Sequence, residues 1–247
     1  MNKLCKQPIL ALSAALGGGI AILLRLWHLQ TRNTRDGRML LAQGHIAGIL
    51  VMCITVIVLA AALWYVLGLP RKLERKCPFP GSVPAIVGVA AGVLGIAYSA
   101  ATFLLESSDP LIKLTGTVGL IAAVCLAGAG YLRMRDYRPN VLLHSAGAVY
   151  LMLVLICQYR MWSAEPQLEL YLYALLATTS LMIATYHRAC FDGKMGNLRC
   201  YTFFRLASIY LCLAAIPGSE FWVLYLSAAI WSIADLCPYA DFSKEGR

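Results

Sequence analysis

Residues 44–76, GHIAGILVMCITVIVLAAALWYVLGLPRKLERK, join a long apolar run to a cluster of basic residues. Residues 44–68 contain no Asp, Glu, Lys or Arg, and as a helix they are long enough to cross a hydrocarbon core of about 30 Å. Four Lys and Arg residues follow between Arg71 and Lys76. Because such clusters are typical of the cytoplasmic ends of membrane helices, this stretch predicts a transmembrane helix that ends in the cytoplasm.

Seven more apolar segments indicate an all-α polytopic integral membrane bundle. We expect eight transmembrane helices, at residues 8–28, 44–68, 82–105, 112–132, 141–159, 168–187, 201–216 and 219–237. Seven is the alternative count if the last two segments, which share the tight turn at 217–220, form a re-entrant pair. Since the loops are short, consecutive helices should be antiparallel neighbours, and residues 1–247 should form a single transmembrane domain.

The composition excludes a soluble globular protein. Hydrophobic residues make up 60% of the chain and charged residues 13%, whereas about 25% of a soluble domain is charged. The formal net charge of +9 would suggest nucleic acid as the partner of a soluble protein. Here the basic residues border apolar helices, so topology and anionic lipid headgroups explain them, and we expect no nucleic-acid partner.

The basic residues also predict the orientation in the membrane. With the N-terminus in the cytoplasm, 15 of the 21 Lys and Arg residues lie on the cytoplasmic side. The positive-inside rule therefore predicts that the N- and C-termini are both cytoplasmic. The expected location is the cell membrane, a prokaryotic cytoplasmic membrane, with the lipid bilayer as the surrounding partner.

The first outer loop departs from this charge rule and is the candidate binding site. It places four arginines on the side where three other loops are acidic. Guanidinium groups bind carboxylates and phosphates through two parallel hydrogen bonds, so the loop predicts an anion-binding outer mouth. Its expected ligand-binding residues are Arg25, Trp27, His28, Arg32, Arg35, Arg38, Gln43, His45 and Arg160. The alternative is a solvated loop whose arginines pair with the outer carboxylates Glu106, Asp109, Glu165 and Glu220.

Small residues at a spacing of about four predict close helix packing. The third predicted span carries Gly88, Gly92 and Gly95, and the fourth carries Gly119. Small residues allow helix backbones to approach closely in lipid, where no hydrophobic force drives helices together. We expect the third and fourth spans to contact each other through this glycine face.

Charged residues are predicted to lie near the ends of the spans. No Asp, Glu, Lys or Arg falls in the middle third of any predicted span, and Arg205 and Asp235 lie within about two turns of an end, from which long side chains reach the interface. Proton-coupled carriers usually need an ionisable residue inside the membrane. The pattern therefore argues against that class.

The histidines allow one cofactor hypothesis. His28 with His45, and His144 with His187, could each supply two axial ligands to a b-type haem. They lie at the edges of the spans, where a haem would be poorly shielded, so we expect no cofactor, with haem b as the testable exception. The spacing of His187 and Cys190 matches no standard zinc pattern, and we predict no metal site.

The sequence leaves three functions open. The first is a non-enzymatic transport or binding protein for an anionic or amphipathic small molecule or lipid, acting through the outer mouth. The second is the membrane anchor of a redox complex that binds haem b or quinone. The third is a structural or assembly partner of another membrane protein. We predict no catalytic residues, because no nucleophile elbow, membrane Ser and Lys pair or cluster of histidine boxes occurs in the chain.

Overall fold

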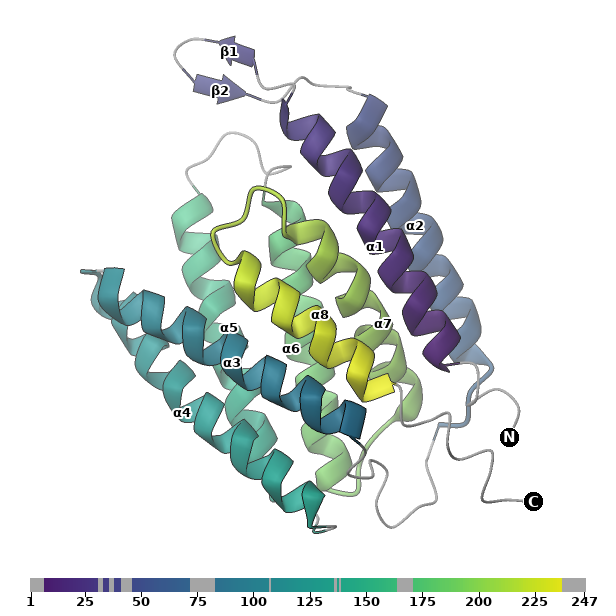
Figure 1. Ribbon diagram of the computed structural model, residues 1–247, viewed down its shortest axis with the longest axis vertical. Helices are drawn as coiled ribbons and strands as arrows, with labels where there is room; N and C mark the ends of the chain where they lie inside the picture. The colour runs from purple at the N-terminus through teal and green to yellow at the C-terminus, as the bar shows by residue number, and fades with distance from the viewer. Residues whose placement is uncertain are drawn as a thin grey trace.

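The structure, a computed structural model, describes residues 7–30, 33–35, 38–40, 46–71, 83–106, 108–135, 137, 139–163 and 171–236. These residues form eight helices and one short antiparallel hairpin (Figure 1). The helices are α1 (Gln7–Gln30), α2 (Ile46–Leu67), α3 (Val83–Glu106), α4 (Pro110–Met134), α5 (Val141–Trp162), α6 (Leu172–Asp192), α7 (Leu198–Ala215) and α8 (Trp222–Leu236). The strands are β1 (Asn33–Arg35) and β2 (Arg38–Leu40).

The predicted helical class is confirmed, and six helices are long and apolar enough to cross a membrane. They are α1, α2, α3, α4, α5 and α7. This number supports a multi-pass membrane protein, because helices satisfy their own backbone hydrogen bonds within lipid. The 15 residues of α8 extend over roughly 22 Å at 1.5 Å per residue, less than the ~30 Å hydrocarbon core. The number of spans and the side of the termini stay predictions.

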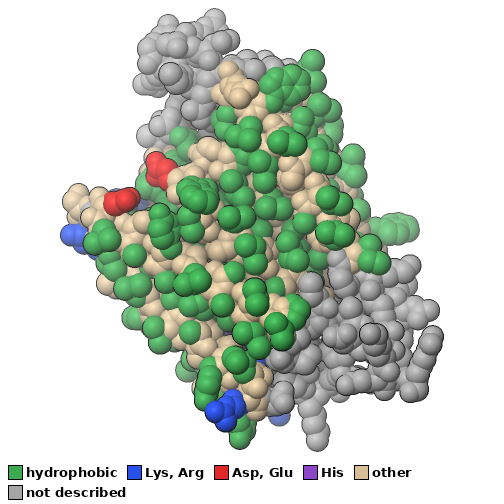
Figure 2. Space-filling view, in the orientation of Figure 1, with side chains coloured by type: hydrophobic (Ala, Val, Ile, Leu, Met, Phe, Trp, Pro, Cys, Tyr) green, Lys and Arg blue, Asp and Glu red, His purple; other side chains and the backbone are tan. Residues whose placement is uncertain are grey.

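Consecutive helices run in opposite directions (Figure 1). We call the end of the bundle at which α1 begins the terminal end, and the end at which β1 and β2 lie the hairpin end. In Figure 1, α3 and α4 lie side by side, and α1 and α2 lie together along α7. Hydrophobic side chains cover most of the face seen in Figure 2, with charged side chains toward its edges. That distribution suits a surface in contact with lipid.

The glycine face of α3 packs against α8. A Cβ atom at Gly92 would lie 2.9 Å from the Trp231 ring, and one at Gly95 would lie 2.5 Å from the Ser227 Cβ atom. The prediction that this face contacts the fourth span is therefore wrong. Helix α4 instead approaches α3 through its own Gly119, which lies against Ala100. Small-residue spacing identifies a face that allows close approach, but it carries no information about which helix approaches it.

Replacing Gly92 with Leu should destabilise the protein by about 1–3 kcal/mol, because the new side chain must displace the Trp231 ring. Gly128→Leu in α4 is the matched control, since a Cβ atom at Gly128 would meet nothing within 4 Å. Both changes remove a helical glycine, so the difference between the two variants isolates the packing contact. Equal free energies of unfolding would show that α3 and α8 separate without cost at this point.

Polar side chains inside the bundle are hydrogen-bonded between helices. The Tyr225 hydroxyl accepts a hydrogen bond from Gln158 Nε2 at 2.8 Å and lies 3.1 Å from the Thr178 hydroxyl. Near α2, the hydroxyls of Thr55 and Tyr210 are 2.8 Å apart. Such bonds link α5, α6 and α8 in one place and α2 and α7 in another, so they fix the relative positions of helices whose apolar surfaces alone are not specific.

Candidate binding site

A buried ionic cluster, which we call the Asp235 cluster, joins α6, α7 and α8 near the terminal end. The Asp235 carboxylate lies 3.2 Å from Arg188 Nη1 and 2.8 Å from Arg205 Nη2. The Tyr201 hydroxyl donates to Asp235 at 3.0 Å and accepts from Arg188 at 2.9 Å. All four side chains are buried. Two guanidinium groups therefore share one carboxylate away from water.

This cluster corrects the interpretation of the span-end charges. We expected Arg205 and Asp235 to reach the membrane interface, but their exposed fractions are 0% and 1%. Helix α7 begins at Leu198, three residues before the predicted start of that span, so Arg205 lies in its third turn. A buried charge at such a depth needs a partner of opposite charge on a neighbouring helix. For Arg205 of α7 this partner is Asp235 of α8. Arg205 also donates to Ser232 at 3.1 Å and stacks on the Trp231 ring at 4.4 Å.

A second buried group, the Asp192 cluster, joins the ends of α4, α5 and α6. Arg133 Nη2 lies 3.0 Å from Asp192 Oδ1, and His144 Nδ1 lies 2.8 Å from Asp192 Oδ2. The three side chains come from the last turn of α4, the first turn of α5 and the last residue of α6. Each is at least nine-tenths buried. Arg133 Nη2 also donates to Asp192 Oδ2 at 3.4 Å, so this oxygen lies next to both the arginine and the histidine.

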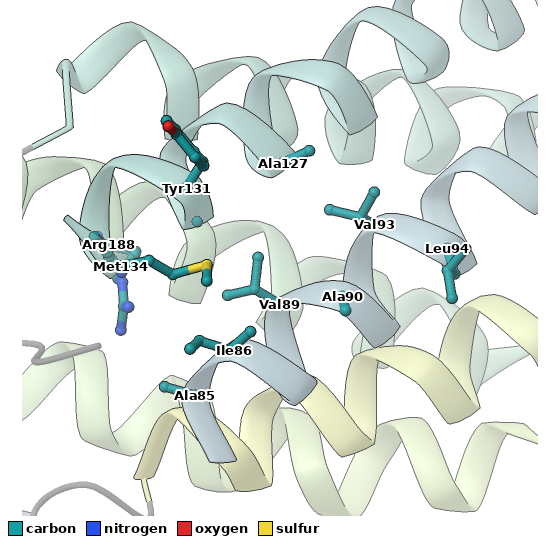
Figure 3. Close-up of a pocket in the computed structure, with 12 residues that line it drawn as sticks. Ala85, Ile86, Val89, Ala90, Val93, Leu94, Ala127, Tyr131, Met134 and Arg188 are labelled. Atoms are coloured by element: carbon teal, nitrogen blue, oxygen red, sulfur yellow. The ribbon is translucent and has the colours of Figure 1, made fainter. Parts of the chain in front are cut away.

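An apolar groove of about 380 Å³ lies between α3 and α4 and reaches both clusters. Small residues of the two helices, including Ala90 and Ala127, line this volume. Arg133 and Arg188 are its only charged lining residues among those that the structure describes. Figure 3 shows Arg188 beside Met134 at one end and Leu94 at the opposite end. The groove is therefore apolar along its length and cationic at the terminal end.

The structure tests little of the predicted outer mouth. Arg32, Gln43 and His45 lie outside the described residues, and only the backbone of Arg35 and Arg38 is described, in β1 and β2. Arg25 is buried at the end of α1, where it donates to the Ala214 carbonyl oxygen at 2.9 Å and lies over the Tyr173 ring.

Three other predicted mouth residues are also described. Trp27 is half exposed and His28 is buried, both near the end of α1. Arg160 lies 3.6 Å from Asp109 in an exposed ion pair. This pair involves an outer carboxylate but no arginine of the first outer loop, so the alternative for the loop stays a prediction. Convergence of the loop arginines on a mouth stays a prediction as well.

The histidines have separate surroundings. His144 contacts Asp192, whereas the His187 ring stacks on Phe204 of α7, with 6.3 Å between ring centroids. Within the described part of the chain, no group of three or more His, Cys, Asp or Glu side chains is placed to bind a metal ion. The haem hypothesis is tested by an absorbance spectrum of the purified protein.

The groove was not predicted from the sequence, because its arginines were explained by the orientation of the protein in the membrane. Arg133 and Arg188 sit at predicted cytoplasmic helix ends, where positive charge is expected for reasons of orientation alone. A usable signal was the presence of two acidic residues, Asp192 and Asp235, at predicted cytoplasmic helix ends. A carboxylate in that position suggests a buried counter-ion.

Comparison of the chain with models of protein families, with curated proteins and with solved structures finds no match. The function is therefore argued from the chemistry of the site itself.

Proposed function

We propose that this multi-pass membrane protein binds an anionic amphiphile in the groove between α3 and α4. The ligand class is a molecule with one anionic headgroup and an apolar tail, bound for storage, sensing or transport. The observation that carries the proposal is the composition of the lining, which is apolar along the groove and has Arg133 and Arg188 at one end. The predicted outer mouth remains a second candidate site for the same class of ligand.

The apolar part of the groove suits a tail that arrives from the bilayer. Leu94, Tyr131 and Met134 line the groove and are each more than half exposed on the outer surface of α3 and α4. In a membrane this surface faces lipid, so a hydrophobic ligand can enter without crossing water. The volume of about 380 Å³ lies within the range of about 300–1,000 Å³ for small-molecule sites.

The cationic end suits the headgroup. Guanidinium groups hold carboxylates, phosphates and sulfonates in a fork of parallel hydrogen bonds, and their attraction for an anion is stronger where water is excluded. Among the described residues, the two clusters contain three arginines and two aspartates. This excess of positive charge favours an anionic headgroup over a neutral or cationic one.

A photo-crosslinking experiment tests the proposal. The probe is a dodecyl sulfonate with a diazirine in its tail, added to the protein in phosphatidylcholine nanodiscs; the matched neutral probe is the corresponding alcohol. We expect the sulfonate to label residues of α3 and α4 along the groove. Ala127→Trp should reduce this labelling about tenfold or more, because the indole fills the groove, and a loss of ~1.4 kcal/mol of binding energy is already tenfold.

Ala61→Trp, an equally large substitution on the exposed face of α2, is the control and should leave the labelling unchanged. Equal reduction by Ala61→Trp, or equal labelling by the neutral probe, would contradict binding in the groove.

A further inference from the structure

We propose that binding of the anion is coupled to the uptake of one proton by His144, because Asp192 is shared between Arg133 in the groove and His144 beside it. This inference rests on the proposed function and adds a regulation of the same site. It makes the protein a proton-coupled anion binder. Its structural basis is the Asp192 cluster.

The geometry places one carboxylate between an arginine and a histidine. Asp192 Oδ1 lies 3.0 Å from Arg133 Nη2, and Asp192 Oδ2 lies 2.8 Å from His144 Nδ1. In the structure His144 Nδ1 makes no hydrogen bond at this distance, whereas a doubly protonated imidazolium in the same place forms an ion pair with the carboxylate. His144 therefore holds the Asp192 carboxylate more strongly when the imidazole is charged.

An incoming anion competes with Asp192 for the same guanidinium. Arg133 lines the groove and is the only one of the three residues of the Asp192 cluster that does so. When a headgroup takes a place on Arg133, the buried Asp192 carboxylate loses part of its compensating charge, which is costly away from water. Protonation of His144 restores that charge, because the imidazolium becomes the counter-ion of Asp192.

The charges balance across this exchange. Before binding, Arg133 offsets Asp192 and His144 is neutral. After binding, Arg133 offsets the ligand anion and protonated His144 offsets Asp192. One anion enters from the membrane and one proton enters from water, so the net charge of the site is unchanged. Linkage then requires that each increases the affinity for the other.

The charged groups near His144 come from the two helices packed against α5. Helix α5 packs between α4 and α6. From α4 the described charged group is Arg133, and from α6 the groups are Asp192 and Arg188, whose guanidinium is held by Asp235. Arginine stays protonated at every accessible pH, and histidine is the side chain that ordinarily changes charge between about pH 5 and 8. The His187 ring stacks on Phe204, so this histidine is not part of the Asp192 cluster.

Calorimetric titration measures the coupling directly. Dodecyl sulfonate is titrated into the protein in nanodiscs at several pH values between about 5 and 8, in two buffers with different heats of ionisation. The sulfonate keeps its charge over this range, so any proton exchange belongs to the protein. We expect an uptake of at most one proton per anion, and an affinity for the sulfonate that falls as the pH rises, by up to about tenfold for each pH unit.

Three variants assign the proton. His144→Gln keeps a hydrogen-bond donor without a titratable charge, so binding should lose its pH dependence and its proton uptake. Asp192→Asn should bind the sulfonate more tightly and independently of pH, because Arg133 no longer holds a carboxylate. His187→Gln, the matched control, should behave as the unmodified protein. A melting curve checks that each variant is folded. The number of protons taken up by the unmodified protein tests the coupling even if a variant fails to fold.

The outcomes separate the two proposals. Absence of sulfonate binding at every pH would overturn the proposed function and this inference together. Binding without proton uptake would overturn the inference and leave the proposed function intact. Proton uptake that persists in folded His144→Gln, or disappears in His187→Gln, would overturn the assignment to His144.

Discussion

Asp235→Ala is expected to destabilise the protein by about 3–5 kcal/mol, since removing one partner of a buried ion pair leaves buried charge without compensation. Asp235 is the carboxylate shared by Arg188 and Arg205, and all three side chains are at most 2% exposed. The same change also removes the acceptor of the Tyr201 hydroxyl. Equilibrium unfolding in mixed micelles measures the effect as a change in the free energy of unfolding.

Arg160→Gln is the control for this prediction. It removes the ion pair with Asp109, whose side chains are 58% and 37% exposed, and such surface pairs contribute about 0–1 kcal/mol. Comparable effects of Asp235→Ala and Arg160→Gln would mean that Asp235 does not act as the counter-ion that fixes α6, α7 and α8 together.

Thiol labelling is expected to give an all-or-none result for the two ends of the bundle. Met195→Cys places a thiol in the exposed turn between α6 and α7 at the terminal end, and Ser108→Cys places one in the exposed turn between α3 and α4 at the hairpin end. If the positive-inside rule holds for this chain, a membrane-impermeant maleimide added to intact cells should react with Ser108→Cys only.

Permeabilised cells should then show reaction at both positions, which confirms that Met195→Cys is accessible. The unmodified protein should stay unlabelled in intact cells, because no cysteine falls in a predicted outer loop. Labelling of Met195→Cys from outside would reverse the predicted orientation.

Helix positions follow closely from the sequence where the helix is apolar to both ends. The predicted span 44–68 is observed as α2, Ile46–Leu67, and the predicted span 82–105 as α3, Val83–Glu106. Within these segments, length and hydropathy are sufficient, because the lipid solvent imposes one thickness and requires internal backbone hydrogen bonds.

The agreement is poorer where a helix ends in buried charge. The segment predicted at 168–187 is observed as α6, Leu172–Asp192, and it continues through Arg188 to Asp192. A hydropathy pattern treats these charged residues as the edge of the span. Their burial depends on partners from α4, α5 and α8, which are distant in sequence and were therefore not predictable from the local pattern.

The groove between α3 and α4 was not predictable from the local pattern for the same reason. The groove forms because α3 and α4 lie side by side and line it with small residues. Arg188 of α6 lines it as well. Small-residue spacing indicated close packing of α3, but the face concerned was the one that packs on α8. The predicted anionic or amphipathic ligand rested on the arginines of the first outer loop, and it stays a prediction.

The packing of α1 and α2 along α7 has a consequence for biosynthesis. The main interhelical contacts of this pair, apart from those with each other, are with α7, which starts about 170 residues after α1 ends. At about 5–20 residues per second, the ribosome needs roughly 8–34 s to reach it. During that time Gly18, which lies against Leu213 in the finished protein, and Thr55, which bonds to Tyr210, face lipid or an insertion factor instead. Translation speed and the membrane insertion machinery therefore act on the first hairpin of this chain before its partner exists.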